Sequence, residues 1–234
     1  MNPSEAGRPE TTGTSCESPV SNPVHAGLEY ERVPSVIYAR SFAAIRREAD
    51  LERFDPTMSG VVARLVHACG DPTIVNSIVS SDGVAERVRS ALASGAPILC
   101  DSTMVAAGVI ERRLPAGNAV LTTLNDSRVP GLAAEIGNTR SAAAVRLWRD
   151  RIESAVVAIG NAPTALFHLL ELLDQGWPRP AAILAFPVGF VGAVESKAEL
   201  ASNPRGCAFL TLAGRRGGSA MAAAAVNAHL DGTE

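Results

Sequence analysis

The sequence has a single lysine, few aromatic residues and no closely spaced cysteines. Lys197 is the one lysine among 21 basic residues, and Phe, Trp and Tyr together make up 4% of the chain. Cys16, Cys69, Cys100 and Cys207 form no CxxC pair, and this spacing argues against a zinc site or a disulfide framework. Because Cys69, Cys100 and Cys207 lie in apolar stretches, we expect them to be small buried side chains.

Charge and hydropathy exclude two classes of partner. The 21 basic and 24 acidic residues give a formal net charge of −3, so the chain has no basic excess for binding duplex nucleic acid. No apolar run approaches the roughly 20 residues needed to span a bilayer. The first residues also lack the basic and apolar segments of a signal peptide. We therefore expect a cytoplasmic protein that binds neither nucleic acid nor membranes.

Several motifs of common enzymes are also missing. The chain contains no GxGxxG of a dinucleotide-binding fold and no GxxxxGK[ST] phosphate loop. It has no GxSxG nucleophile elbow and no HExxH metal motif. Few nucleophilic residues follow the predicted strands, so hydrolytic chemistry is disfavoured.

The chain has two parts of different composition. Residues 1–27 are rich in Pro, Ser, Thr and Gly and nearly free of large apolar residues, so they cannot bury enough surface to form a core. We predict that they form a disordered tail. A chain of 234 residues fits one domain, which we place at residues 28–234.

In this second part, short apolar runs alternate with helical patterns. Helices are predicted at residues 35–49, 58–69, 84–93, 129–136, 141–152, 163–174 and 219–230. Strands are predicted at residues 97–100, 118–124, 155–159, 181–186 and 207–212. The later strands are apolar on both faces, which is typical of a parallel sheet between helices. We predict an α/β fold with three α/β/α layers, a mostly parallel sheet and a helical N-terminal region.

In such a sheet, ligands bind beyond the carboxyl ends of the strands. The turn at residues 160–164 follows one predicted strand, and we expect its backbone N–H groups to face a ligand. The segment at residues 186–197 follows the next strand and carries two aromatic residues that look exposed, Phe186 and Phe190. The loop at residues 214–219 opens the last helix with glycines and two arginines, which suits a carboxylate or a phosphate. The alternative for this loop is an ordinary surface turn.

His67 is the best candidate for acid–base chemistry among the four histidines. It lies one turn before the end of a predicted helix, where the helix dipole favours a positive charge. Arg64 lies three residues earlier, on the same face of that helix. His168 lies in an apolar helix, and we expect it to pack in the core. The alternative for His67 is also a structural role, because a lone helical histidine is more often structural.

Seven segments together resemble the precorrin-8X methylmutase (precorrin isomerase) family of the cobalamin pathway. They are AIRRE after Arg40-Ser41-Phe42, RLVHACGD, GAPILCDSTMVAAG, TRSAAA, AIGNAPTAL, PVGFVGAVESK and the final GRRGGSAMAAAAVNA. They extend from about Tyr30 to Leu230. One departure is Arg216, where the family commonly has lysine.

The resemblance implies an isomerase that moves a methyl group from C-11 to C-12 of precorrin-8X and yields hydrogenobyrinate, without a cofactor or a metal. It also implies a homodimer with active sites near the subunit interface. The family's catalytic histidine falls on His67, and its nearby substrate contacts fall on Ser41 and Arg64. Within or beside the matched segments, further substrate contacts are expected at Asp101, Arg140, Asn161, Gly217, Gly218 and Ser219.

The residue chemistry fits this reaction. A rearrangement within one molecule needs no nucleophile, only a rigid pocket and a placed proton. The main alternative is a non-catalytic tetrapyrrole carrier, which would keep the arginines and glycines but would not need His67. A nucleotide-binding transferase is a weaker alternative, and the absence of a His/Cys/Glu cluster with ligand spacing disfavours a metal-chelating enzyme. The sequence leaves open whether the substrate carries cobalt.

Overall fold

The structure is a computed structural model that describes residues 28–230. The tail predicted at residues 1–27 lies outside the described residues, and so do residues 231–234. Contacts between residues divide the chain into two units, Met1–Arg32 and Val33–Glu234. Every helix and strand described below belongs to the second unit.

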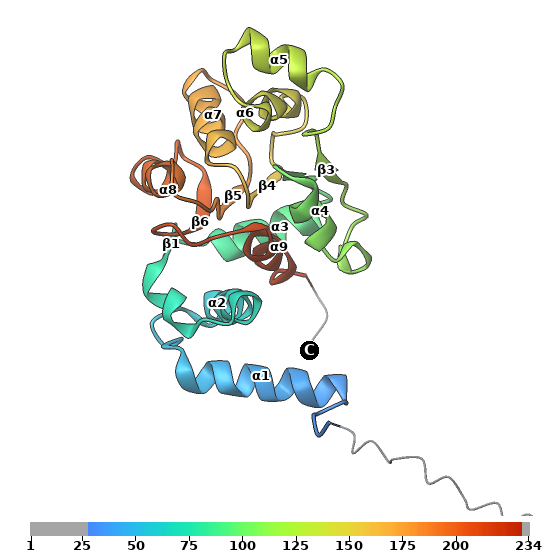
Figure 1. The fold of residues 1–234 in the computed structure, drawn as a ribbon, viewed down its shortest axis with the longest axis vertical. Helices are drawn as coiled ribbons and strands as arrows, with labels where there is room; N and C mark the ends of the chain where they lie inside the picture. Colours follow the sequence, from blue (N-terminus) through green and yellow to red (C-terminus); the bar gives the residue numbers. More distant parts are fainter. Residues whose placement is uncertain (1–27, 231–234) are drawn as a thin grey trace, which may run out of the picture. The chain divides into compact units, whose positions relative to one another are not determined.

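Six strands form one sheet in the order β1-β6-β5-β4-β2-β3 (Figure 1). Five of them are mutually parallel and correspond to the predicted strands: β2 (Ile98–Cys100), β3 (Val120–Thr122), β4 (Val156–Ile159), β5 (Ala182–Ala185) and β6 (Ala208–Leu212). The sixth, β1 (Ile78–Ser80), pairs antiparallel with β6 at the edge. The sequence analysis missed β1, since three residues carry too little periodicity to be recognised.

One face of the sheet is covered by α6 (Arg140–Val145), α7 (Pro163–Asp174) and α8 (Ala193–Ser202) (Figure 1). The helix α5 (Val129–Glu135) packs outside α6. A short 3-10 helix, η3 (Arg146–Trp148), continues α6. The helix α8 was not predicted, because the sequence analysis treated residues 186–197 as one segment after a strand.

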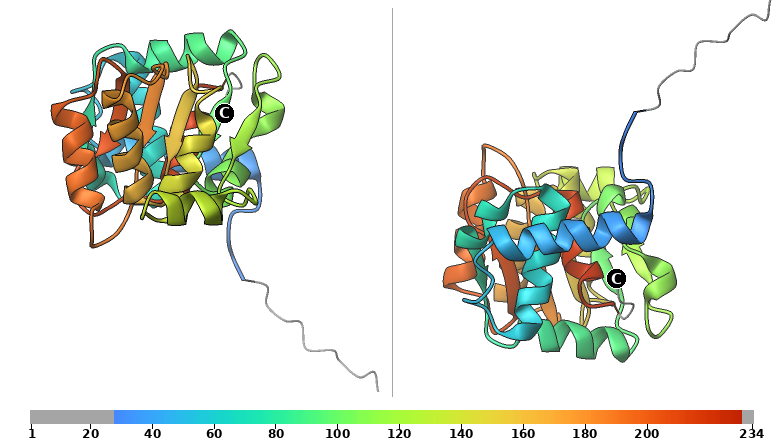
Figure 2. Two further views of the ribbon diagram at one scale, coloured as in Figure 1. Left: turned by 90° about the horizontal axis from the view of Figure 1, so that it is seen from above. Right: turned by 90° about the horizontal axis from the view of Figure 1, so that it is seen from below.

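The other face is covered by α3 (Val84–Ala93), α4 (Thr103–Gly108) and α9 (Ser219–Asn227), with the 3-10 helix η2 (Glu111–Arg113) after α4. The helix α2 (Pro56–Cys69) packs on α9, and α1 (Pro34–Glu48) packs on α2 as the outermost helix (Figure 2). The predicted α/β/α fold with a helical N-terminal region is confirmed. No helix among residues 28–230 is long and apolar enough to cross a membrane.

The ends of α2 are fixed by local chemistry. The Asp55 carboxylate caps the first turn by accepting hydrogen bonds from the backbone N–H groups of Thr57 and Met58. At the other end Gly70 adopts a left-handed conformation with φ of 68°, which a glycine reaches without strain. The chain then enters the 3-10 helix η1 (Pro72–Ser77). These signals place His67 in the last turn of α2, where it was predicted.

Candidate active site

The candidate site begins at the topological switch point of the sheet. The chain leaves β2 for β3 on one side and returns to β4 on the other, so β2 and β4 are neighbours whose connections diverge. Open α/β sheets form a ligand-binding crevice at the carboxyl ends of such strands. Asp101 and Ser102 follow β2 at this point, and Gly160 and Asn161 follow β4.

The carboxylate of Asp101 bridges the two strand ends. One oxygen accepts a hydrogen bond from the backbone N–H of Gly160 at 3.0 Å, and the other accepts those of Asn161 at 3.0 Å and Ala162 at 2.8 Å. Asp101 is 3% exposed. Burial raises its pKa, and the three backbone hydrogen bonds oppose that rise.

This arrangement corrects one prediction about the turn after β4. Its N–H groups were expected to face a ligand, but three of them are bound by Asp101. Both oxygens of Asp101 face the turn, so the structure assigns this carboxylate a bracing contact. A contact of Asp101 or of the half-buried Asn161 with substrate stays a prediction.

The first turn of α9 lies directly against the turn after β4. A side chain on Gly160 would come within 2.7 Å of the Ser219 Cα, so the close approach requires glycine. The hydroxyl groups of Ser102 and Ser219 are 3.4 Å apart. The start of α9 therefore reaches the crevice between β2 and β4.

The loop at residues 214–218 is fixed by its backbone. A side chain on Gly217 would come within 2.3 Å of the Phe186 carbonyl oxygen, and the N–H of Gly218 donates to that same oxygen at 2.8 Å. Phe186 is fully buried, so the prediction that it looks outward is wrong. Phe190, in contrast, is 84% exposed, and the guanidinium of Arg215 lies 5.2 Å from its ring centroid.

The two arginines of this loop have different surroundings. The Arg216 guanidinium forms an ion pair with the carboxylate of Asp71 and donates to the Thr73 hydroxyl at 3.1 Å. Arg215 has no carboxylate partner among residues 28–230. The prediction that this loop suits an anion stays a prediction and rests on Arg215, whereas Arg216 connects the loop to the segment that follows α2.

His67 lies one helical turn before Asp71, the residue that forms the ion pair with Arg216. Its exposed ring is stacked on Phe42 of α1, with centroids 5.0 Å apart and planes inclined by 29°. Arg64 donates to the hydroxyl of Tyr38 at 2.9 Å. His67 and Ser41 line a common cavity of about 210 Å³. The helices α1 and α2 thus bring together the three residues Ser41, Arg64 and His67.

Arg140 begins the helix α6, on the face of the sheet opposite α9. It is exposed, and its guanidinium donates to the Leu124 carbonyl at 3.2 Å. The preceding Thr139 contacts Thr164 of α7 through their hydroxyl groups at 2.8 Å. Within residues 28–230, no single cavity found in the structure is lined by all of the predicted site residues.

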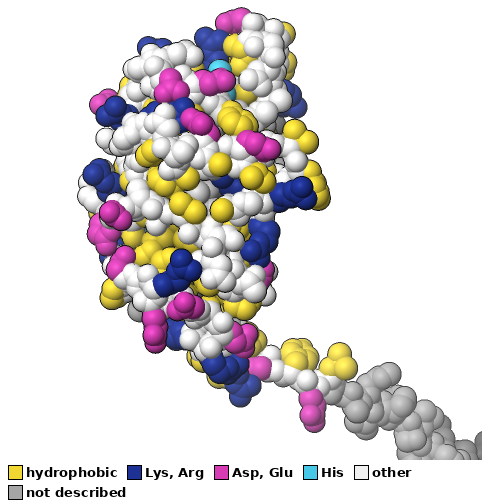
Figure 3. Space-filling model, turned by 90° about the vertical axis from the view of Figure 1, so that its left-hand side faces the viewer, with side chains coloured by type: hydrophobic (Ala, Val, Ile, Leu, Met, Phe, Trp, Pro, Cys, Tyr) yellow, Lys and Arg dark blue, Asp and Glu magenta, His cyan; other side chains and the backbone are white. Residues whose placement is uncertain are grey.

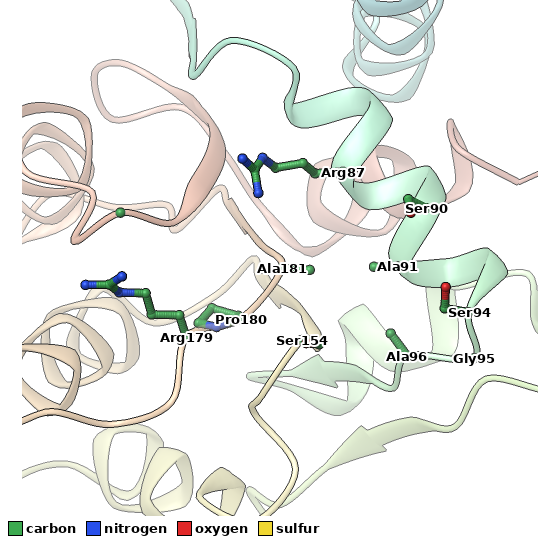
Figure 4. Close-up of a pocket in the computed structure, with 11 residues that line it drawn as sticks. Arg87, Ser90, Ala91, Ser94, Gly95, Ala96, Ser154, Arg179, Pro180 and Ala181 are labelled. Carbon is green, nitrogen blue, oxygen red and sulfur yellow. The ribbon is translucent and has the colours of Figure 1, made fainter.

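A cavity of about 620 Å³ lies at the opposite edge of the sheet, before the strands begin (Figure 4). Arg87 of α3 and Arg179, which precedes β5, lie on its two sides. None of the predicted site residues lines it. Since ligands of open α/β sheets bind at the carboxyl ends of the strands, we separate this cavity from the candidate site.

Of the other predictions about single residues, some are confirmed and one is wrong. Cys100 and Cys207 are buried as expected, but Cys69 at the end of α2 is exposed, so that prediction is wrong. His168 is buried and pairs with Glu171 at 2.8 Å, which confirms its packing role. Within the described part of the chain, no group of three or more His, Cys, Asp and Glu side chains could hold a metal ion.

Sequence reasoning missed three side chains that support the site. Phe42 and Tyr38 lie within the predicted helix at residues 35–49, and Asp71 follows the predicted helix at residues 58–69, but none of the three was assigned a role at the site. No sequence pattern indicates their roles, because each of these side chains contacts a residue in a different helix or loop. Lys197 was noted as the single lysine, and its buried position bears on the loop at residues 214–218.

The comparisons with known proteins agree with one another. The family model CbiC, precorrin-8X methylmutase, matches residues 36–231, which include every predicted site residue. A precorrin-8X methylmutase of a Sinorhizobium species is 58% identical over 199 residues, covering 85% of this chain and 95% of the relative. The Pseudomonas aeruginosa precorrin-8X methylmutase is 55% identical over 201 residues, 86% of this chain and 97% of the relative.

Two further proteins extend the comparison. A cobalt-precorrin-8 methylmutase of Priestia megaterium is 33% identical over 196 residues, 83% of this chain and 86% of the relative. The solved structure of a precorrin-8x methyl mutase from Thermus thermophilus superimposes with a TM-score of 0.75 at 35% identity, covering 83% of this chain and 94% of that one.

The bridge at Asp101 generates a stability prediction. An Asp101→Asn side chain would turn an amide N–H₂ group toward backbone N–H groups that need acceptors, so at least one buried donor loses its partner. We expect the free energy of unfolding to fall by about 2 kcal/mol, measured by urea denaturation. As a control, Asp174→Asn removes an exposed partner of Arg205, which keeps Glu199, and should change stability by less than about 0.5 kcal/mol. Equal effects of the two substitutions would contradict the bracing role.

Proposed function

This chain belongs to the precorrin-8X methylmutase family, and we propose that His67 is its proton donor and acceptor in the methyl shift from C-11 to C-12. The family isomerises precorrin-8X to hydrogenobyrinate. The observation that carries the proposal is the position of the His67 ring, exposed beside Ser41 and braced by Phe42.

Within one substrate molecule, the methyl group leaves C-11 as its bond to C-12 forms. A proton placed on the ring system during this step helps to redistribute electrons, and it must return afterwards because substrate and product are isomers. A histidine side chain can act both as general acid and as general base, and the stacking on Phe42 restricts the orientation of the His67 ring. The same group can therefore give and recover the proton.

The arginines account for recognition of the substrate. A tetrapyrrole with many carboxylates requires positive groups spread over its width. The Arg64 guanidinium uses one donor on Tyr38 and keeps others for a carboxylate, while Arg140 and Arg215 are exposed. The face shown in Figure 3 displays hydrophobic side chains interspersed with both basic and acidic side chains, and its apolar part suits a flat apolar ring.

The degree of identity supports a substrate without cobalt. The first group, the precorrin-8X methylmutases of the Sinorhizobium species and of Pseudomonas aeruginosa, is 55–58% identical to this chain, whereas the Thermus thermophilus precorrin-8x methyl mutase is 35% identical. Those named cobalt-precorrin-8 methylmutase are 31–35% identical. The chain thus resembles the first group more closely, and we assign it the metal-free substrate.

The His67 proposal predicts a loss of turnover without a loss of binding. His67→Ala should lower kcat by at least about 100-fold, the usual effect of removing a general acid or base. The measurement is the absorbance change as precorrin-8X becomes hydrogenobyrinate. His168→Gln, which can keep its hydrogen bond to Glu171, is the control and should retain turnover. A folded His67→Ala variant that isomerises at the wild-type rate would refute the proposal, and a wild-type protein that binds but never turns over would favour the carrier alternative.

The proposed role of Arg64 predicts weaker binding. Arg64→Ala removes a charge-assisted contact, so the Kd for hydrogenobyrinate should rise about tenfold or more in an absorbance titration. Arg53→Ala causes the same change in net charge at the opposite end of α2, where Arg53 bonds to Asn76. We expect this control to bind as the wild type does. Equal affinity of all three proteins would contradict the contact.

We also propose that a second copy of the chain completes the site. A cavity of about 210 Å³ beside His67 is below the usual size of ligand pockets, which begins at about 300 Å³. Large apolar side chains are exposed in the β5–α8 connection, with Phe190 at 84% and Val191 at 89%, and Ile37 on α1 is exposed as well. Such surface is typical of interfaces. Sedimentation equilibrium should give the mass of two chains, and a single-chain mass in the presence of hydrogenobyrinate would contradict the proposal.

A further inference from the structure

Lys197, the single lysine of the sequence, is almost completely buried. It lies on α8 with 1% of its surface exposed. Its ammonium group donates a hydrogen bond to the backbone carbonyl of Arg216 at 2.6 Å. A helix on one face of the sheet thereby holds the loop that leads into α9 on the other face.

No carboxylate neutralises this ammonium group. Lys197 forms no ion pair with any described residue. The neighbouring strands β1 and β6 carry no titratable group. Three of the four carboxylates on α7 and α8 are bound elsewhere, since Glu171 pairs with His168 while Asp174 and Glu199 pair with Arg205. The fourth, Glu195, is exposed in the first turn of α8. Burial lowers the pKa of Lys197 to about 8.

The Arg216 carbonyl belongs to a loop that is held residue by residue. The Arg215 carbonyl accepts from the Gly189 N–H at 3.2 Å, and the Gly218 N–H donates to the Phe186 carbonyl at 2.8 Å. Lys197 acts between these two contacts, at Arg216. The loop also contains Gly214 and Gly218 with φ of 87° and 126°, so without such ties its backbone has wide conformational freedom.

We propose that Lys197 is a positioning residue that fixes the loop at residues 214–218 and so places Gly217, Gly218 and Ser219 for substrate contact. This inference rests on the proposed function, in which these three residues bind the tetrapyrrole. A buried charge without a carboxylate partner costs stability, so packing alone does not explain a lysine here. The lysine is explained if its side chain must reach the Arg216 carbonyl at the edge of the sheet and donate a strong hydrogen bond to it.

Two substitutions separate donation from packing. Lys197→Met has a similar shape but donates nothing, whereas Lys197→Arg keeps a charged donor. The larger guanidinium has room in a cavity of about 100 Å³ lined by Lys197, Val79 and Thr211. If the residue positions the loop, Arg replaces it better than Met; if it only fills space, the order is reversed. Ser196→Ala is the matched control, because Ser196 is equally buried but bonds only to Ala193 within α8.

The experiment measures hydrogenobyrinate affinity by absorbance titration, turnover of precorrin-8X and the Tm of each variant. At pH 7 we expect Lys197→Met to raise Kd and KM about tenfold with an unchanged or higher Tm. We expect Lys197→Arg and Ser196→Ala to stay within about threefold of the wild type. Between pH 7 and 9.5 the wild-type Kd should rise as the ammonium loses its proton, while Lys197→Arg should show no such rise.

The possible outcomes are distinct. A wild-type protein that does not bind hydrogenobyrinate would overturn the proposed function itself. Wild-type binding together with unchanged affinity in Lys197→Met, or with better binding by Met than by Arg, would overturn the positioning role alone. If Lys197→Met fails to fold, the pH profile of Lys197→Arg decides, because an alkaline limb that persists in this variant excludes titration of the lysine as its cause.

Discussion

Asp101 lies where the sheet divides, and its carboxylate accepts three consecutive backbone N–H groups from the turn after β4. The two neighbouring strand ends carry backbone groups that a ligand or water would otherwise satisfy. By binding those groups from within, Asp101 satisfies a turn that is buried at Gly160 and half-buried at Asn161 and Ala162, and it lets Gly160 contact the first turn of α9. The position of α9, and of every helix packed outside it, depends on this contact.

The position of α9 in turn determines where the helices that pack on it lie. Four of the six buried residues of α9 are alanines, which lets α2 and α4 pack closely against it. The helix α2 carries His67 and Arg64, and α1 adds Phe42, Tyr38 and Ser41 against them. The ion pair between Arg216 and Asp71 then joins the end of α2 to the loop before α9. The two groups of site residues are therefore connected through packing and this ion pair, although they share no cavity among the described residues.

The sequence predicted the fold well because the elements that form it have strong local signals. Buried strands such as β4 and β5 are apolar on both faces, and α2 and α7 begin with a proline or cap and end at a recognisable break. Failures occurred where tertiary contacts decide. The strand β1 forms only because β6 offers an edge, and the buried state of Phe186 depends on the loop that crosses it. The occupied N–H groups after β4 could not be foreseen, because their acceptor lies in a different strand connection.

The cations of the candidate site divide into those that hold the protein and those that remain for a ligand. Arg216 is paired with the carboxylate of Asp71, and Lys197 is buried against a backbone carbonyl, so both charges are already engaged within the protein. Arg64 is oriented by Tyr38 but keeps further donors, and Arg140 and Arg215 are exposed. A net charge of −3 conceals this distribution, since it averages over the whole chain. In the proposed function, recognition of an anionic tetrapyrrole depends on a few arginines whose positions are set by neutral contacts, so it requires no basic excess over the whole chain.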